Sequence, residues 1–184
     1  MYWSKVLPNL NNAKLGIVIA AIGWVFAVVF ALYLAYQQQT QVFDPDNKMA
    51  QTDWLQSFHA TMGIKSKGIE LTHADTLYIV DENSCVCSTR SQPHIQSLSE
   101  YALNNDIHVV KLTPTPALAR LLPAQPAAIL VSKEQQLVYA GPLSKGLACS
   151  SQNGFVELVI ANLRAGFNSR FINSDAKGCY CQIS

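Results

Sequence analysis

A long uncharged run near the N-terminus limits how this chain can fold. Residues 15–36, LGIVIAAIGWVFAVVFALYLAY, include no charged side chain. As an α-helix this run would be about 33 Å long, enough to cross the ~30 Å hydrocarbon core of a bilayer. A cleaved signal peptide usually has an apolar stretch of only about 7–15 residues, followed by a small-x-small cleavage site. Because the run is longer, and because Ala31-Leu32-Tyr33 is a poor site, we expect a retained signal-anchor helix.

Charges on the two sides of this run predict its orientation. Lys5 and Lys14 precede it, and the first charges after it are Asp44 and Asp46. Positively charged flanks stay on the cytoplasmic side of a membrane. We therefore expect a single-pass protein with a cytoplasmic N-terminus and with residues 37–184 on the opposite side.

The remaining charge excludes one class of partner. The whole chain has a formal net charge of +1 from 13 basic and 12 acidic residues. Lys5 and Lys14 are the charged residues of positions 1–36, so the exported part keeps 11 basic against 12 acidic residues. Nucleic-acid binding needs a clustered basic face, and the sequence has none. We expect no nucleic-acid partner, and the sequence assigns no oligomeric state.

Hydrophobic periodicity in the exported part predicts an α/β domain. We expect strands at residues 76–80, 107–112, 127–131 and 136–140, and helices at 48–62, from Gln92 to 103, at 117–122 and at 155–163. Strands that alternate with helices indicate a parallel portion, and the last two strands indicate an antiparallel hairpin. The predicted organisation is a cytoplasmic N-terminus at 1–14, a transmembrane helix at 15–36, a linker at 37–47, the domain at 48–166 and a cysteine-containing tail at 167–184.

The five cysteines are grouped rather than scattered. They form the pairs Cys85-x-Cys87 and Cys179-x-Cys181, with Cys149 alone between them. An odd number outside the cytosol leaves at least one thiol free or paired with another chain. Cys85 follows the predicted strand 76–80 after the polar turn 81–84. A cysteine at a helix N-terminus has its thiolate stabilised by the helix dipole and by free N–H groups.

Three stretches of the chain resemble the thioredoxin-like superfamily. The strand 77–80 leads to Cys85, Pro126 directly precedes the strand 127–131, and residues 138–146, VYAGPLSKG, are followed by a helix. The likeness covers about residues 76–165. The usual Cys-x-x-Cys motif of that superfamily is replaced here by Cys85-Val86-Cys87. With its apolar anchor and cysteine tail, the chain is similar to uncharacterised membrane-anchored bacterial thioredoxin-like proteins.

The resemblance implies a thioredoxin-like fold and a thiol–disulfide oxidoreductase or isomerase in the inner membrane, with its domain in the periplasm. Cys85 would attack, Cys87 would resolve, and Pro126, in the cis form, would shape a groove for extended protein thiol or disulfide substrates. Residues two apart can close a small disulfide ring, so a Cys85–Cys87 bond is allowed, and the connectivity of the five cysteines stays open. The loop with Cys149 is expected near the site, and Cys179 and Cys181 could reach it as an internal redox relay.

Two other functions stay open at this point. The two Cys-x-Cys pairs offer four soft ligands that suit Cu(I) or Zn, and His94 could join them, although zinc sites usually space their cysteines by two to four residues. In that case the protein would bind or deliver metal. Otherwise no cofactor or metal is expected. The third possibility is a non-catalytic interaction module whose cysteines are structural staples.

Overall fold

The computed structural model describes residues 12–63, 74–82, 84–147 and 154–183. The chain divides into two compact units, residues 1–39 and residues 40–184. The first unit contains the helix α1, Asn12–Gln39. Residues 14–39 of α1 have exposed side chains, and the helix is long and apolar enough to cross a membrane, as the sequence predicted.

The start of the expected linker takes part in this helix. Gln37 donates a hydrogen bond from Nε2 to the Tyr33 hydroxyl, one helical turn earlier, at 2.9 Å. Glutamine also has a good intrinsic helix propensity. Farther along, the strand β1, Gln41–Val42, and the buried side chains of Phe43 and Asp44 belong to the second unit. Most of the expected linker is therefore ordered structure.

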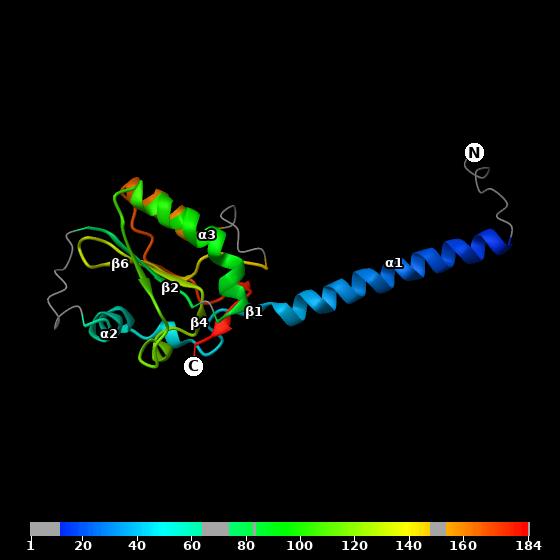
Figure 1. Ribbon diagram of the computed structural model, residues 1–184, viewed down its shortest axis with the longest axis horizontal. Helices are drawn as coiled ribbons and strands as arrows, with labels where there is room; N and C mark the ends of the chain where they lie inside the picture. The colour runs from blue at the N-terminus through cyan, green and yellow to red at the C-terminus, as the bar shows by residue number, and fades with distance from the viewer. Residues whose placement is uncertain (1–11, 64–73, 83, 148–153, 184) are drawn as a thin grey trace, which may run out of the picture. The chain divides into compact units, whose positions relative to one another are not determined.

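The second unit is built on a mixed five-stranded sheet (Figure 1). Its order is β3-β2-β5-β6-β7. The strands are β2 Thr76–Val80, β3 His108–Leu112, β5 Ala127–Val131, β6 Leu137–Pro142 and β7 Phe171–Ile172. β2 is parallel to β3 and antiparallel to β5, β5 is antiparallel to β6, and β6 is parallel to β7. The parallel portion and the late hairpin are confirmed, and β7 is an addition that the sequence did not reveal.

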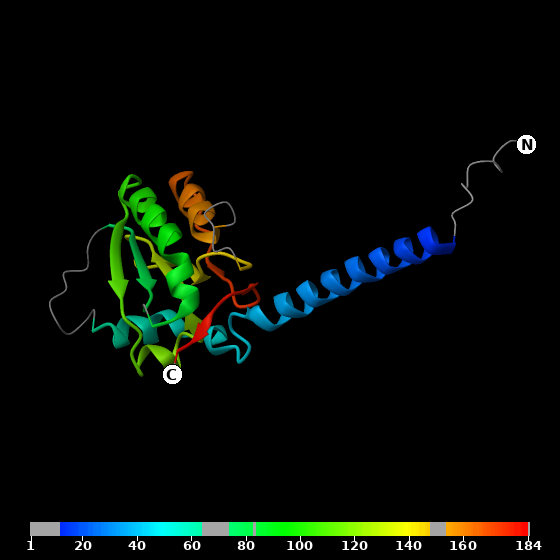
Figure 2. The same cartoon turned by 45° about the vertical axis from the view of Figure 1, so that its right-hand side comes forward.

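Helices cover both faces of this sheet (Figures 1 and 2). The helical elements are η1 Lys48–Ala50, α2 Trp54–Thr61, α3 Val86–Leu103, η2 Leu118–Arg120 and α4 Phe155–Arg164. One core lies between α3, α4 and the sheet, and contains Leu77, Leu98 and Ile160. The other lies between α2 and the opposite face, and contains Phe58 and Ile129. With both faces covered, every residue of β5 is buried, which is why the sequence shows it as an unbroken apolar run.

The start of α3 differs from the sequence prediction. The helix begins at Val86 with Cys85 as its N-cap, and Pro93 lies inside it. The expectation of a start at Gln92 was wrong because the first two turns are polar and show no apolar periodicity. In these turns the buried Ser91 hydroxyl donates a hydrogen bond to the Cys87 carbonyl at 2.8 Å.

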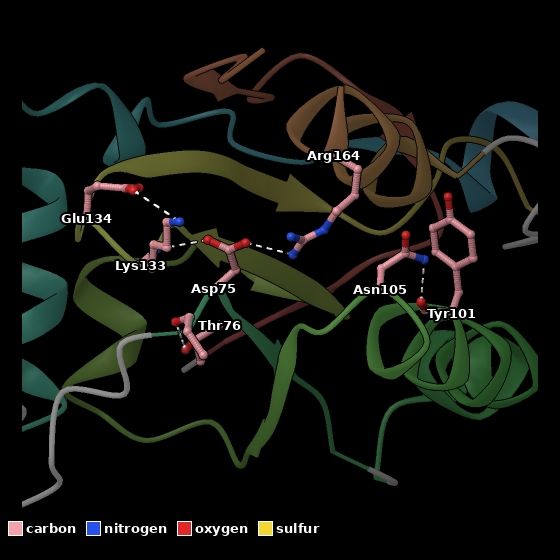
Figure 3. A network of polar contacts seen from close by, with 8 residues as sticks. Asp75, Thr76, Tyr101, Asn105, Lys133, Glu134 and Arg164 are labelled. Atoms are coloured by element: carbon pink, nitrogen blue, oxygen red, sulfur yellow. Dashed lines mark hydrogen bonds and ion pairs between the residues drawn. The ribbon is translucent and has the colours of Figure 1, made fainter. Parts of the chain in front are cut away.

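A polar network joins three elements of the second unit (Figure 3). Asp75, just before β2, accepts a hydrogen bond from the Lys133 backbone N–H at 2.9 Å. Its other carboxylate oxygen lies 2.7 Å from an Arg164 guanidinium nitrogen on α4. Asp75 is only 7% exposed, so these partners replace the water that the carboxylate loses on burial.

The C-terminal segment is part of the fold rather than a loose tail. Beyond β7 it forms β8, Lys177–Gly178, and β9, Cys181–Gln182. β8 pairs with β1, and β9 pairs with β4, Ala124–Gln125, both antiparallel. These two-residue strands have no periodicity to detect in the sequence.

Candidate functional site

Cys85 is the N-cap of α3, although the periodicity of the sequence placed the start of this helix at Gln92. Its backbone is extended, and its sulfur accepts a hydrogen bond from the Ser88 backbone N–H at 3.4 Å. A free N–H group and the positive end of the helix dipole favour negative charge at this position. The sulfur of Cys85 therefore lies where a thiolate, once formed, is stabilised.

Both cysteines of the first pair are bonded to the C-terminal segment. Cys85 forms a disulfide with Cys181, and Cys87 forms one with Cys179. The Cα–Cα distances are 6.1 Å and 5.4 Å, within the range that a disulfide allows. A ring between Cys85 and Cys87, which their spacing allows, is therefore not the pairing in this structure. Each of the two cysteines is bonded instead to a partner in the tail.

The four sulfur atoms form one cluster. The sulfurs of Cys85, Cys87 and Cys181 all lie within 4.8 Å of one another, and Cys179 is bonded to Cys87. Cys85, Cys87 and Cys179 are each 5% exposed, while Cys181 is half-buried and Leu147 packs beside them. The sequence prediction that the tail could reach the first pair is confirmed, and Cys181 is the most accessible of the four cysteines.

Pro126 lies beside this cluster. The Gln125–Pro126 peptide bond is cis, as the resemblance implied. In the pairing of β4 with β9, Gln125 stands opposite Cys181. Gln125 is 4% exposed, and its side-chain oxygen has no hydrogen-bond partner among the described residues. The tail thus runs as an extended segment along the strand that leads into Pro126, with a disulfide to Cys85.

Contacts that involve no sulfur also hold the tail in place. The Tyr180 ring is 5% exposed and packs edge-on against Phe43, with ring centroids 5.1 Å apart. The Tyr180 hydroxyl donates to the Ser144 carbonyl at 2.9 Å, and the Tyr180 carbonyl accepts a hydrogen bond from the Gln41 side chain. Ile183 is 6% exposed in the larger core. The sequence analysis did not predict this anchoring, although the apolar side chains of Tyr180 and Ile183 in a mostly polar segment are a signal of it.

Two other candidate residues lie elsewhere. His94, considered as an additional metal ligand, is 3% exposed on α3, and its Nε2 lies 2.6 Å from a carboxylate oxygen of Glu157 on α4. This partly buried pair joins the two helices, and His94 is not part of the sulfur cluster. Cys149, predicted to lie near the site, is outside the described residues.

Chemically, the cluster offers two properties. A disulfide joins a half-buried sulfur, Cys181, to a sulfur at a helix N-terminus, Cys85. A third sulfur, Cys87, lies within 4.8 Å of both. Disulfide exchange requires a thiolate near a disulfide sulfur, and this arrangement supplies that geometry within one domain.

Comparisons with known proteins add a family but no activity. No curated protein matches the sequence. Two solved structures share 61% of this chain with a TM-score of 0.48: an uncharacterized conserved protein from Geobacillus kaustophilus, at 14% identity over 77% of its length, and the hypothetical protein SMc02350 from Sinorhizobium meliloti 1021, at 11% identity over 80%. A family model described as "Domain of unknown function (DUF6436)" matches residues 55–183, which include the four clustered cysteines and Pro126. The chain therefore belongs to the DUF6436 family.

Proposed function

We propose that this protein is a membrane-anchored thiol–disulfide oxidoreductase or isomerase that exchanges disulfides with protein thiols. The observation that carries the proposal is the Cys85–Cys181 disulfide, which links the N-cap of α3 to an extended strand beside cis Pro126. A cysteine at a helix N-terminus has the environment of reactive cysteines in general.

A thioredoxin-like relationship is part of this proposal. Three features support it: a central strand, β2, that leads to a helix with cysteines at its start, a cis proline directly before β5, and helices on both faces of a mixed sheet. The pairing of Cys85 with Cys181 rather than Cys87 changes the expected roles. Cys85 keeps the role of the reactive thiolate, and Cys181 takes the role of its disulfide partner.

The first exchange step would take place at Cys181. A partner thiolate attacks its sulfur, forms a mixed disulfide with it and releases Cys85 as a thiolate. A second thiol of the same partner, as a thiolate, then attacks the mixed disulfide and frees Cys181. The partner dithiol loses two electrons and two protons, and the chain gains them. Cys85 is the favoured leaving group because the Ser88 N–H and the helix dipole stabilise its thiolate.

The second disulfide would act as the internal relay that the tail cysteines suggested. The Cys85 thiolate lies within 4.8 Å of the Cys87 sulfur. Its attack there forms a Cys85–Cys87 disulfide and releases the thiolate of Cys179, with no net change in oxidation state. The small ring that the Cys-x-Cys spacing allows would thus be an intermediate of internal exchange.

The proposed location follows from α1. With Lys14 at its N-terminal side and Asp44 beyond its end, the positive-inside rule favours a cytoplasmic N-terminus. The second unit would then face the bacterial periplasm, where disulfides form and persist.

A redox titration with cysteine mapping tests this function. The full chain in detergent, carrying Cys149→Ser, is equilibrated in glutathione buffers, alkylated and analysed by mass spectrometry. We expect Cys85 and Cys181 to become reduced first, while the far-ultraviolet circular dichroism stays unchanged. Cys181→Ser should abolish exchange with a dithiol peptide, and Cys179→Ser should leave the first exchange intact.

A structural role is the alternative that the burial of three of the cysteines favours. Staples would resist reduction until the circular dichroism signal of the fold is lost. Loss of both disulfides only together with the fold would therefore overturn the exchange proposal and assign the cysteines to stability.

A further inference from the structure

We infer that the reduced protein binds one thiophilic metal ion, Zn²⁺ or Cu⁺, in a closed site made by Cys85, Cys87, Cys179 and Cys181. This inference goes beyond disulfide exchange. It requires only that the disulfides can be reduced while the fold remains.

We expect the four cysteine ligands to stay together after reduction. Tyr180 lies between Cys179 and Cys181, and Ile183 lies two residues after Cys181. Both side chains are buried in the same core and anchor the tail there. The pairings of β1 with β8 and of β4 with β9 hold the same segment through the backbone. None of these contacts uses sulfur. Opening the two disulfides therefore leaves four thiols facing one another in a largely buried place.

The distances between the sulfur atoms are close to those of a tetrahedral metal site. Tetrahedral zinc has Zn–S bonds of about 2.3 Å, which places its sulfurs about 3.8 Å apart. The sulfurs of Cys85, Cys87 and Cys181 already lie within 4.8 Å of one another. The Cys179 sulfur is bonded to Cys87 and has to approach Cys85 and Cys181 as that bond opens, while each bonded pair separates by about 2 Å through side-chain rotation.

The negative charge of buried thiolates favours a bound cation. Three of the four cysteines are 5% exposed, and buried thiolates without a cation are costly. A thiophilic cation offsets that cost, and thiolates select Zn²⁺ and Cu⁺ among common metals. The Ser88 N–H that points to the Cys85 sulfur is a typical outer-shell contact of metal thiolates.

The structure removes the objection that the sequence raised. The single residue between the cysteines of each Cys-x-Cys pair matches zinc spacing poorly, but here each pair supplies half of the site from a different element: the start of α3 and the tail. Four protein sulfurs leave no open coordination position, so the site is suited to holding a metal rather than to catalysis with it.

Metal binding is therefore coupled to redox state. Two dithiol reductants deliver four electrons and four protons to the two disulfides and become disulfides themselves. The ion then displaces thiol protons as it binds. Re-oxidation of the four sulfurs by two disulfide oxidants, each of which takes up two electrons and two protons and becomes a dithiol, removes the ligands and releases the metal.

The test uses the full chain in detergent with the Cys149→Ser substitution, so that only the four clustered thiols remain. The protein is reduced with a phosphine, freed of reductant without oxygen and offered Zn²⁺ or Cu⁺ in separate samples. We expect one ion per chain to survive buffer exchange by elemental analysis, and none in the oxidised protein. Co²⁺ as a spectroscopic probe should give the intense visible bands of a tetrahedral thiolate site. Retention of Cu⁺ alone would assign the site to copper, and retention of Zn²⁺ to zinc.

Matched variants locate the site. Cys181→Ser in the same background should weaken Zn²⁺ binding by more than about 100-fold against a chelating dye, since even outer-shell partners are worth 10–100-fold. The parent with Cys149 intact should bind like the Cys149→Ser protein. A reduced, folded chain that retains neither ion, or unchanged affinity in Cys181→Ser, would overturn the inference, as would loss of circular dichroism on reduction. Because exchange is assayed without metal, a chain that binds Zn²⁺ but does not exchange would refute only the proposed function.

Discussion

The two disulfides close almost the same loop, and this predicts strongly non-additive stability effects. Their sequence separations are 96 residues for Cys85–Cys181 and 92 for Cys87–Cys179. In the chain-entropy model, either bond alone stabilises the fold by about 4.7 kcal/mol. Once one bond is present, the other closes a ring of only about six residues and adds about 2 kcal/mol.

The perturbation is the removal of each bond separately and then of both. The Cys85→Ala/Cys181→Ala and Cys87→Ala/Cys179→Ala variants should each lose about 2 kcal/mol of unfolding free energy, because the remaining bond still closes the long loop. The fourfold variant should lose about 7 kcal/mol. The coupling between the two pairs, the fourfold loss less the two single-pair losses, is thus about 3 kcal/mol, well above the scatter of independent sites.

Urea unfolding of residues 40–184 measures this coupling. Those residues form a compact unit of their own, and Trp54, 2% exposed, is their one tryptophan and a fluorescence reporter. All variants carry Cys149→Ser, which prevents exchange with a fifth thiol. The urea dependence should stay similar in the two single-bond variants and increase in the fourfold variant, whose unfolded chain is no longer compacted by a cross-link. Losses that simply add would refute loop closure and point to packing of the sulfurs in the native state.

Three further predictions concern the scaffold. In Gly178→Ala the added Cβ would lie 2.6 Å from the Tyr180 hydroxyl oxygen, so we expect the tail to shift and the disulfides to be reduced faster, measured by alkylation rate. Asp75→Asn removes the negative charge that faces Arg164 and should cost about 1–3 kcal/mol in urea unfolding. Burial raises the pKa of the Tyr139 hydroxyl well above its usual value. The stabilising effect of the protonated hydroxyl is thus complete below about pH 10 and is lost as the pH rises further. Thermal melts should therefore show a smaller loss of stability at alkaline pH in Tyr139→Phe.

The central strands could be predicted from the sequence almost residue by residue. β2 and β5 agree with the expected ranges because each is an unbroken apolar run between polar turns. Such runs are visible because helices cover both faces of the sheet. Pro126 was found through resemblance to a known fold, since nothing in the local sequence distinguishes a cis from a trans proline.

The ends of elements and the tail could not be predicted in the same way. The first turns of α3 are polar, and Ser88 and Ser91 are buried there without an apolar repeat to mark them. β8 and β9 are two residues long and exist because β1 and β4 offer them backbone partners. Their formation depends on residues far away in the chain, to which periodicity does not respond.

The cysteine pairing is the sharpest case, because the bonds span more than ninety residues. Spacing alone left the connectivity of the cysteines open, whereas the fold brings the tail to α3 and anchors it through Tyr180 and Ile183. Since that anchoring does not use sulfur, opening the disulfides changes the bonds and charges of the cluster but not its position. Exchange and metal binding would therefore both be properties of one fixed set of sulfurs. What separates them is access: a partner needs to reach only the half-buried Cys181, while a metal ion needs all four thiols reduced at once.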